Sequence, residues 1–333
     1  MRAAGAVAAA ADAVLGRWSG DPALRGAFLA GSVTDLEPDD EVPATSDIDV
    51  TVVLAGTTGG RRKARIGELV VETTLLDVAE LADEERVART HWLAPSFRGG
   101  FVLADPTGAL RRLEDRIAPG FTAPDAVLGR VDDVLELVRH RLAAAGPAGS
   151  WAAAVLGWVF PISLPTQAPL IAALRTPTVR RRYAATREVL DAETYAWLVD
   201  LLVPEDPGPA AVRAALADLT AAWPADGVDD VDLPFSADLS AWARAVALGS
   251  GAELVDAGLH REAVFWTVVS AARCAVALGR GDGAPFADLA AGLTGLRGPT
   301  DLAARSDRCL AGLPALRQAC VDLISRAPAG GLP

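Results

Sequence analysis

The chain has 333 residues, of which 51% are hydrophobic and 22% are charged, and its formal net charge is −12. The hydrophobic fraction is too high for a disordered chain, and the length predicts two packed units rather than one small domain. The acidic balance disfavours nucleic acids as partners, because phosphate backbones are repelled and no counterions are released, whereas small cations are attracted.

The expected location is the cytoplasm, with no membrane as partner. Apolar runs are broken by Arg, Asp, Gly or Pro before they reach the length of a membrane span. The first 18 residues are rich in alanine and interrupted by Asp12 and Arg17, which predicts an amphipathic helix rather than a secretory leader. The cysteines have neither metal-ligand nor disulfide spacing, which is typical of small core residues in a reducing compartment; they are Cys274, Cys309 and Cys320.

The first third of the chain alternates between strand and helix patterns. The β-branched stretches DIDVTVVL and ELVVETTLLDV predict two strands, and the stretch TTGGRRKARIG between them predicts a turn and a connector. In chain order we expect a helix over 3–18, strands over 27–31, 47–54 and 68–78, a helix over 79–92 and a short strand within 101–108.

Beyond about residue 122 the spacing of apolar residues is helical. The acidic stretch ADGVDDVD at 225–232 lacks the Gly and terminal Glu of a calcium loop, so we expect a solvated loop there. The predicted fold class is α+β, with a mixed sheet and flanking helices in a domain over 1–120 and a larger all-helical domain over 121–333. The expected helices are 125–145, 150–174, 178–190, 193–203, 209–222, 236–249, 260–280, 285–295 and 300–326.

Two carboxylates stand at the start of the strand DIDVTVVL. Strand alternation places Asp47 and Asp49 on one face and the apolar residues between them on the other. Burying two unpaired carboxylates side by side is costly, and a divalent cation such as Mg²⁺ would offset that cost. A third carboxylate from a neighbouring strand would complete such a site, and Glu72 is the first candidate, with Asp77 as the second.

A Gly-Ser pair follows the short apolar strand over 27–31. Gly31 lets the backbone approach phosphate oxygens closely, and Ser32 offers a hydroxyl and an N–H to the same group.

The order of these features resembles the nucleotidyltransferase superfamily, the fold of DNA polymerase beta and of aminoglycoside nucleotidyltransferases. Gly31-Ser32 followed by Ser46-Asp47-Ile48-Asp49 is similar to that family's signature over roughly residues 25–80, although the segment between Ser32 and Ser46 is longer than usual. The whole chain also resembles bacterial proteins described only as containing a nucleotidyltransferase domain, through FVLADPTGAL, TPTVRRRYAATREVL and HREAVFWTVVSAARC.

This resemblance implies an enzyme that transfers a nucleoside monophosphate to a hydroxyl group, with ATP as the expected donor and pyrophosphate as the leaving group. Asp47, Asp49 and Glu72 would hold two Mg²⁺ ions, which stabilise the attacking and leaving oxygens when about 3.5–4 Å apart. The nucleotide phosphates would be bound by Gly31, Ser32 and Ser46.

Five arginines gather at 175–190 in an otherwise acidic chain. One interpretation is a clamp on the triphosphate, in which Arg181 or Arg182, with Tyr183, faces a cleft opposite the Gly-Ser pair. The alternative is a set of surface ion pairs. The resemblance favours a functional role for Arg182 and Tyr183.

For the other candidate residues of the helical half, the sequence favours structural roles. Glu262 near the start of a helix could orient a sugar or amine substrate or act as a general base, but a helix-start carboxylate paired with an arginine is the preferred interpretation. His260 is expected to cap or pack, and Trp151 and Trp158 are expected in the core.

Three functions are compatible with these patterns. The first is nucleotidyl transfer to a hydroxylated small molecule, with a cationic acceptor as one option. The second is nucleotidylation of a protein or RNA, with RNA disfavoured by the net charge. The third is a catalytically silent nucleotide-binding or interaction protein, which ranks last because all three candidate carboxylates are present.

Overall fold

The computed structural model describes the chain except residues 44, 145, 147, 225–232 and 327–333. The expectation of a solvated loop at 225–232 therefore lies outside the described residues. The predicted α+β class is confirmed, with a five-stranded sheet early in the chain and helices after it. The chain divides into two compact units. One comprises Met1–Asp133, Ile171–Thr178 and the end of the chain from Ile324, and the other Val134–Leu170 and Val179–Leu323.

The first unit is built on a mixed sheet with strand order β3-β4-β2-β1-β5. β2 and β4 are parallel neighbours, whereas β1 is antiparallel to β2 and β5, and β3 is antiparallel to β4. Its elements are α1 (Ala3–Arg17), β1 (Leu24–Ala30), η1 (Gly31–Asp35), β2 (Asp47–Leu54), β3 (Gly60–Ile66), β4 (Leu69–Asp77), η2 (Val78–Leu81), α2 (Glu84–Arg89), η3 (Ala94–Phe97), β5 (Val102–Ala104), α3 (Ala109–Ile117) and η4 (Ala118–Gly120). The helix α4 (Pro124–Ala143) follows and is divided between the two units after Asp133.

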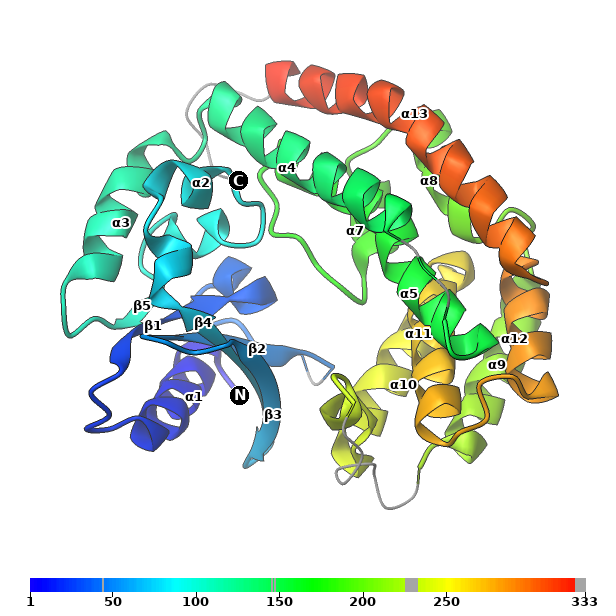
Figure 1. Cartoon of the computed structure of the whole chain (residues 1–333), viewed down its shortest axis with the longest axis horizontal. Coiled ribbons are helices and arrows are strands. Elements are labelled where there is room, and N and C mark those ends of the chain that lie inside the picture. The colour runs from blue at the N-terminus through cyan, green and yellow to red at the C-terminus, as the bar shows by residue number, and fades with distance from the viewer. Residues whose placement is uncertain (44, 145, 147, 225–232, 327–333) are drawn as a thin grey trace. The chain divides into compact units, whose positions relative to one another are not determined.

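Both faces of this sheet are covered, which follows from the alternation of side chains along each strand. On one face, Ile48 and Val50 of β2 pack with Ala6 and Ala10 of α1. On the other face, Phe28 and apolar residues of β2 and β4 pack with α2, η3 and α3. Figure 1 shows α1 on one side of the sheet and α2 and α3 on the other.

The second unit contains helices only among its described residues. Its centre is α11, in which every residue from Glu262 to Ala275 is buried. The remaining elements of the chain are α5 (Trp151–Ser163), η5 (Leu164–Thr166), α6 (Gln167–Ala172), α7 (Arg182–Arg187), α8 (Ala192–Leu202), α9 (Gly208–Ala222), η6 (Ser236–Leu239), α10 (Ala241–Asp256), α11 (His260–Ala277), α12 (Ala284–Thr294) and α13 (Pro299–Arg326).

The structure differs from the expected elements mainly where charged residues are dense. The expected connector TTGGRRKARIG contains β3, because pairing with β4 supplies the backbone hydrogen bonds that the charged sequence does not suggest. The expected helix over 79–92 is divided into η2 and α2, since Asp83 caps a new helix start. The helix α3 was not expected.

The helical stretch Trp151–Ala172 is the one among the described residues that is long and apolar enough to cross a membrane by length and composition, and 78% of its most apolar window is buried. A buried core helix has the same composition. Trp158 is in the core, and the cysteines are buried and free, as expected, whereas Trp151 is only partly buried.

Candidate functional site

The candidate site lies on the face of the sheet opposite α1. Ile48 and Val50 point into the core beneath α1, so Asp47 and Asp49 point to the other face. β4 runs parallel to β2 and places Glu72 directly beside Asp49. The sheet register therefore brings residues from two strands together.

The three carboxylates form a compact cluster. One oxygen of each of Asp47, Asp49 and Glu72 lies within 4.8 Å of an oxygen of the other two. The side chains of Asp47 and Glu72 are only 12% exposed. Carboxylates this close repel one another, so the arrangement needs positive charge.

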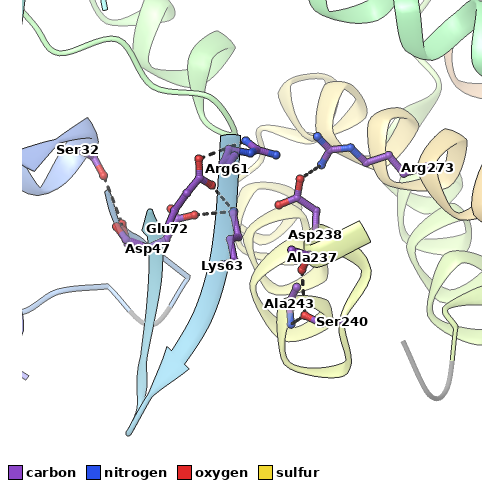
Figure 2. Close-up of polar contacts among 11 residues, drawn as sticks. Ser32, Asp47, Arg61, Lys63, Glu72, Ala237, Asp238, Ser240, Ala243 and Arg273 are labelled. Carbon is purple, nitrogen blue, oxygen red and sulfur yellow. Dashed lines mark hydrogen bonds and ion pairs between the residues drawn. The ribbon is translucent and has the colours of Figure 1, made fainter. Parts of the chain in front are cut away.

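Two basic residues of β3 provide positive charge. The Lys63 ammonium lies 2.8 Å from Oδ2 of Asp47 and 2.9 Å from Oε2 of Glu72. Arg61, two residues earlier on the same face, donates to Oε1 of Glu72 at 3.3 Å. In Figure 2, dashed lines join Lys63 to both Asp47 and Glu72, and another joins Arg61 to Glu72.

Gly31 follows β1 at the edge of this cluster. Ala30, the last residue of β1, pairs with Asp49, so the chain turns beside that carboxylate. The turn has a positive φ of 69° at Gly31, a conformation that glycine adopts readily. A β-carbon at this position would overlap with Oδ2 of Asp49. The glycine is therefore required both by the backbone and by the space left for the carboxylate.

Ser32 and Ser46 lie together beside the cluster, with their hydroxyl oxygens 3.3 Å apart. The long segment between them is attached to the start of α1. The N–H of Ala3 donates to the carbonyl of Asp40 at 2.8 Å, and the N–H of Val42 donates to the carbonyl of Met1 at 3.0 Å. The extra residues of this segment thus provide acceptors for N–H groups that a helix start leaves unpaired.

The second candidate for the third carboxylate is not in the cluster. The Asp77 carboxylate accepts a hydrogen bond from the N–H of Ala79 at 2.8 Å and caps η2. Its separation from Glu72 along β4 explains this: five residues place the two on opposite faces of the strand.

The predicted arginine clamp belongs to the second unit, and its members differ in environment. Arg181 is exposed and pairs with Glu253 at 3.7 Å, as a surface ion pair would. Arg182 and Tyr183 are buried, with 2% and 3% of their surface exposed. The Tyr183 hydroxyl has no hydrogen-bond partner among the described residues. Contact of these residues with a triphosphate stays a prediction.

Arg182 has several partners inside the second unit. Its guanidinium donates to Oγ of Ser163 at 2.7 Å and to the carbonyl of Val179 at 2.9 Å. It also lies 4.5 Å from the ring centre of Phe265, within the range of a cation–π interaction. Burial lowers the pKa of Arg182 to about 10, which still leaves it charged at neutral pH.

Glu262 and His260 are engaged in pairs within the second unit. Glu262 is buried, accepts a hydrogen bond from the Tyr195 hydroxyl at 2.6 Å and lies 3.3 Å from Arg187. The pairing of Glu262 with an arginine was expected. Nε2 of His260 lies 2.7 Å from a carboxylate oxygen of Asp206.

Sequence reasoning did not identify Lys63 and Arg61 as part of the site. The signal available was weak: Lys63 is the only lysine of the chain and alternates with Arg61 and Arg65. The pattern indicates a row of basic side chains on one face only when β3 is recognised as a strand, because residues two apart in a strand share a face.

The oxygen donors of the cluster fit a hard divalent cation. Three carboxylates converge, and an ammonium already lies between two of them, which shows that the position favours positive charge.

No family model matches the chain, and no curated protein matches it. Among solved structures it is similar to a nucleotidyltransferase-like protein from Exiguobacterium sibiricum 255-15, with 12% identity, coverage of 77% of each chain and a TM-score of 0.28. A similarity with so low a TM-score supports no conclusion about this chain.

Proposed function

We propose that the chain is a magnesium-dependent nucleotidyltransferase that transfers a nucleoside monophosphate, with ATP as the donor, to a hydroxyl group of a small molecule. The observation that supports this most is the cluster of Asp47, Asp49 and Glu72 on one sheet face beside the Gly31 turn. The motif resemblance described above assigns the same residues to the same chemistry.

In this reaction the acceptor oxygen forms a bond to the α-phosphorus, the bond from that phosphorus to the bridging oxygen breaks, and pyrophosphate leaves. Magnesium held by the three carboxylates would supply Lewis-acid stabilisation of the phosphate charge. One of these carboxylates takes the proton of the acceptor hydroxyl. Gly31 lets the backbone approach the phosphates, and the hydroxyls of Ser32 and Ser46 offer them hydrogen bonds.

The proposed acceptor is a hydroxylated small molecule, with hydroxylated amines included because the chain is strongly acidic. The same net charge disfavours RNA. The proposed location is the cytoplasm, which suits three buried thiols that form no disulfide.

The test has two stages. Thermal unfolding with each nucleoside triphosphate and Mg²⁺ identifies the donor, because a ligand that binds only the folded chain raises the melting temperature. Radiolabelled donor is then incubated with hydroxylated acceptors, and labelled product and pyrophosphate are measured. We expect Asp49→Asn to lower turnover by at least about a hundredfold while the fold is retained. Unchanged transfer by this variant contradicts the proposal.

A catalytically silent nucleotide-binding protein is the second candidate. The observation that favours it is the position of Lys63, whose ammonium lies between Asp47 and Glu72, where a metal ion would be expected. Triphosphate binding without pyrophosphate release across the acceptor set would support this candidate over the enzyme.

A further inference from the structure

Lys63 is held in an unusual position for a lysine on an edge strand. Its side chain is 10% exposed, although most of β3 is exposed to solvent. Lys63 pairs with Glu72 across the sheet, and Glu72 pairs with Asp49, so the three residues form one row on the same face. The sheet register itself therefore directs the ammonium to the carboxylates.

The chemistry of the side chain suits this position. Every other basic residue apart from the histidines is arginine, and the only lysine of the chain stands here. An ammonium is a compact point charge with three donors, whereas a guanidinium is a planar fork that suits a single carboxylate. Lys63 reaches two carboxylates from different strands at 2.8 and 2.9 Å.

The charges of the cluster balance with one divalent ion. Three ionised carboxylates and one ammonium leave two negative charges, which a single divalent cation would neutralise. Arg61 adds positive charge at Glu72, but its side chain is 41% exposed, so solvent screens that charge more than it screens the charge of Lys63. Two divalent ions beside Lys63 would instead produce an excess of positive charge until a nucleotide arrived.

We propose that Lys63 is a built-in cation of the site, which takes one cation position between Asp47 and Glu72 so that the chain without nucleotide binds one divalent ion. This inference rests on the proposed metal site and differs from the two-ion expectation. Lys63 acts through the carboxylates and is a positioning residue.

The test is a titration of the full chain with Mn²⁺ in the absence of nucleotide, followed by electron paramagnetic resonance. We expect the unchanged chain to bind one Mn²⁺. Lys63→Met, which is unbranched and one atom shorter and removes the charge, should bind a second Mn²⁺ or bind the first at least tenfold more tightly. Lys63→Arg should bind Mn²⁺ less tightly than Lys63→Met, because it keeps a positive charge beside the carboxylates.

Arg65→Met is the matched control. Arg65 lies on the same strand and face, is 52% exposed and pairs with Glu68 rather than with the cluster. This variant removes the same charge and should bind Mn²⁺ like the unchanged chain. The inference would be overturned if Lys63→Met keeps its unfolding transition but binds Mn²⁺ no more tightly than the unchanged chain. It would also be overturned if neither the unchanged chain nor Lys63→Met binds Mn²⁺.

A second measurement tests whether the ammonium stays in place. Lysine labelled with ¹³C at Cε gives one side-chain resonance, because the chain has one lysine. We expect this resonance to remain broad and shifted when Mg²⁺ is added. A narrow signal at the position of free lysine would show that the metal expels the ammonium, which contradicts the inference. Neither measurement uses nucleotide. If the transfer assay described above detects no nucleotidyl transfer, the proposed function is refuted but this inference still stands.

Discussion

Gly31 and Asp49 lie so close together that a β-carbon on the glycine would overlap with the carboxylate of the aspartate. The contact joins the turn after β1 to the acidic cluster on β2. It couples two parts of the candidate site that are separated in the sequence, one expected to bind phosphates and the other a metal.

We predict that Gly31→Ala weakens Mn²⁺ binding at least tenfold, because Asp49 must move away from the cluster. Gly56→Ala is the control. Gly56 has a similar positive φ of 74°, but a β-carbon there would meet nothing within 4 Å. Both variants should lose roughly 1 kcal/mol of stability from backbone strain. Equal Mn²⁺ affinities in the two variants would show that the contact with Asp49 is unimportant.

The third carboxylate can be tested by two amide substitutions on one strand. Glu72→Gln should lower Mn²⁺ affinity and nucleotidyl transfer at least tenfold, since it removes one charge from the cluster. Asp77→Asn should leave both unchanged, because asparagine also caps a helix start. Calorimetric titration and the transfer assay measure the two effects. A larger loss with Asp77→Asn would reverse the assignment.

Arg182 is predicted to stabilise the second unit. Arg182→Ala removes a buried cation with its hydrogen bonds and cation–π contact, and we expect a loss of about 2–4 kcal/mol in unfolding free energy. Arg181→Ala should cost less than about 0.5 kcal/mol, because Arg181 forms an exposed pair. Denaturant unfolding of both variants measures this.

The same two variants test the predicted triphosphate clamp. Triphosphate affinity is measured at a temperature where both variants remain folded. If the clamp exists, the variant that lacks its arginine binds the triphosphate less tightly than the unchanged chain. Unchanged affinity in both would leave the arginines with structural roles alone.

The pair of His91 and Asp133 predicts a pH-dependent contribution to stability. Partial burial alone would raise the pKa of Asp133, but hydrogen bonds from the ring and the backbone N–H of His91, at 2.6 and 2.9 Å, outweigh this and lower the pKa. A carboxylate whose folded-state pKa is lowered contributes stability above its unfolded pKa of about 4. That contribution disappears as the pH falls through the folded-state pKa.

Asp133→Asn should therefore destabilise the chain at pH 7 by about 1 kcal/mol, a modest value because the carboxylate is 37% exposed. The difference should shrink below about pH 4. Urea unfolding at several pH values provides the measurement, with Asp115→Asn on the exposed face of α3 as the control. A difference that persists at low pH would point to packing instead.

Patterns of the sequence alone predict much of the first unit and of its acidic pair. Alternation in DIDVTVVL places Asp47 and Asp49 on one face, and a mid-strand Glu72 in an apolar stretch indicates a buried partner. These inferences succeed because side-chain direction in a strand is a local property with a period of two residues. The helical pattern after residue 122 is local in the same way.

Only the tertiary structure decides which charges meet. The stretch TTGGRRKARIG looks like a connector because its charged residues show no apolar face, and β3 exists through its pairing with β4. That pairing brings Lys63 to Glu72 and Asp47. Likewise, Arg182 is buried because Ser163 and Phe265 supply partners from distant helices. Sheet register and helix packing join residues far apart in the chain, and the local pattern around a residue can indicate that it has a partner but does not identify which residue that partner is.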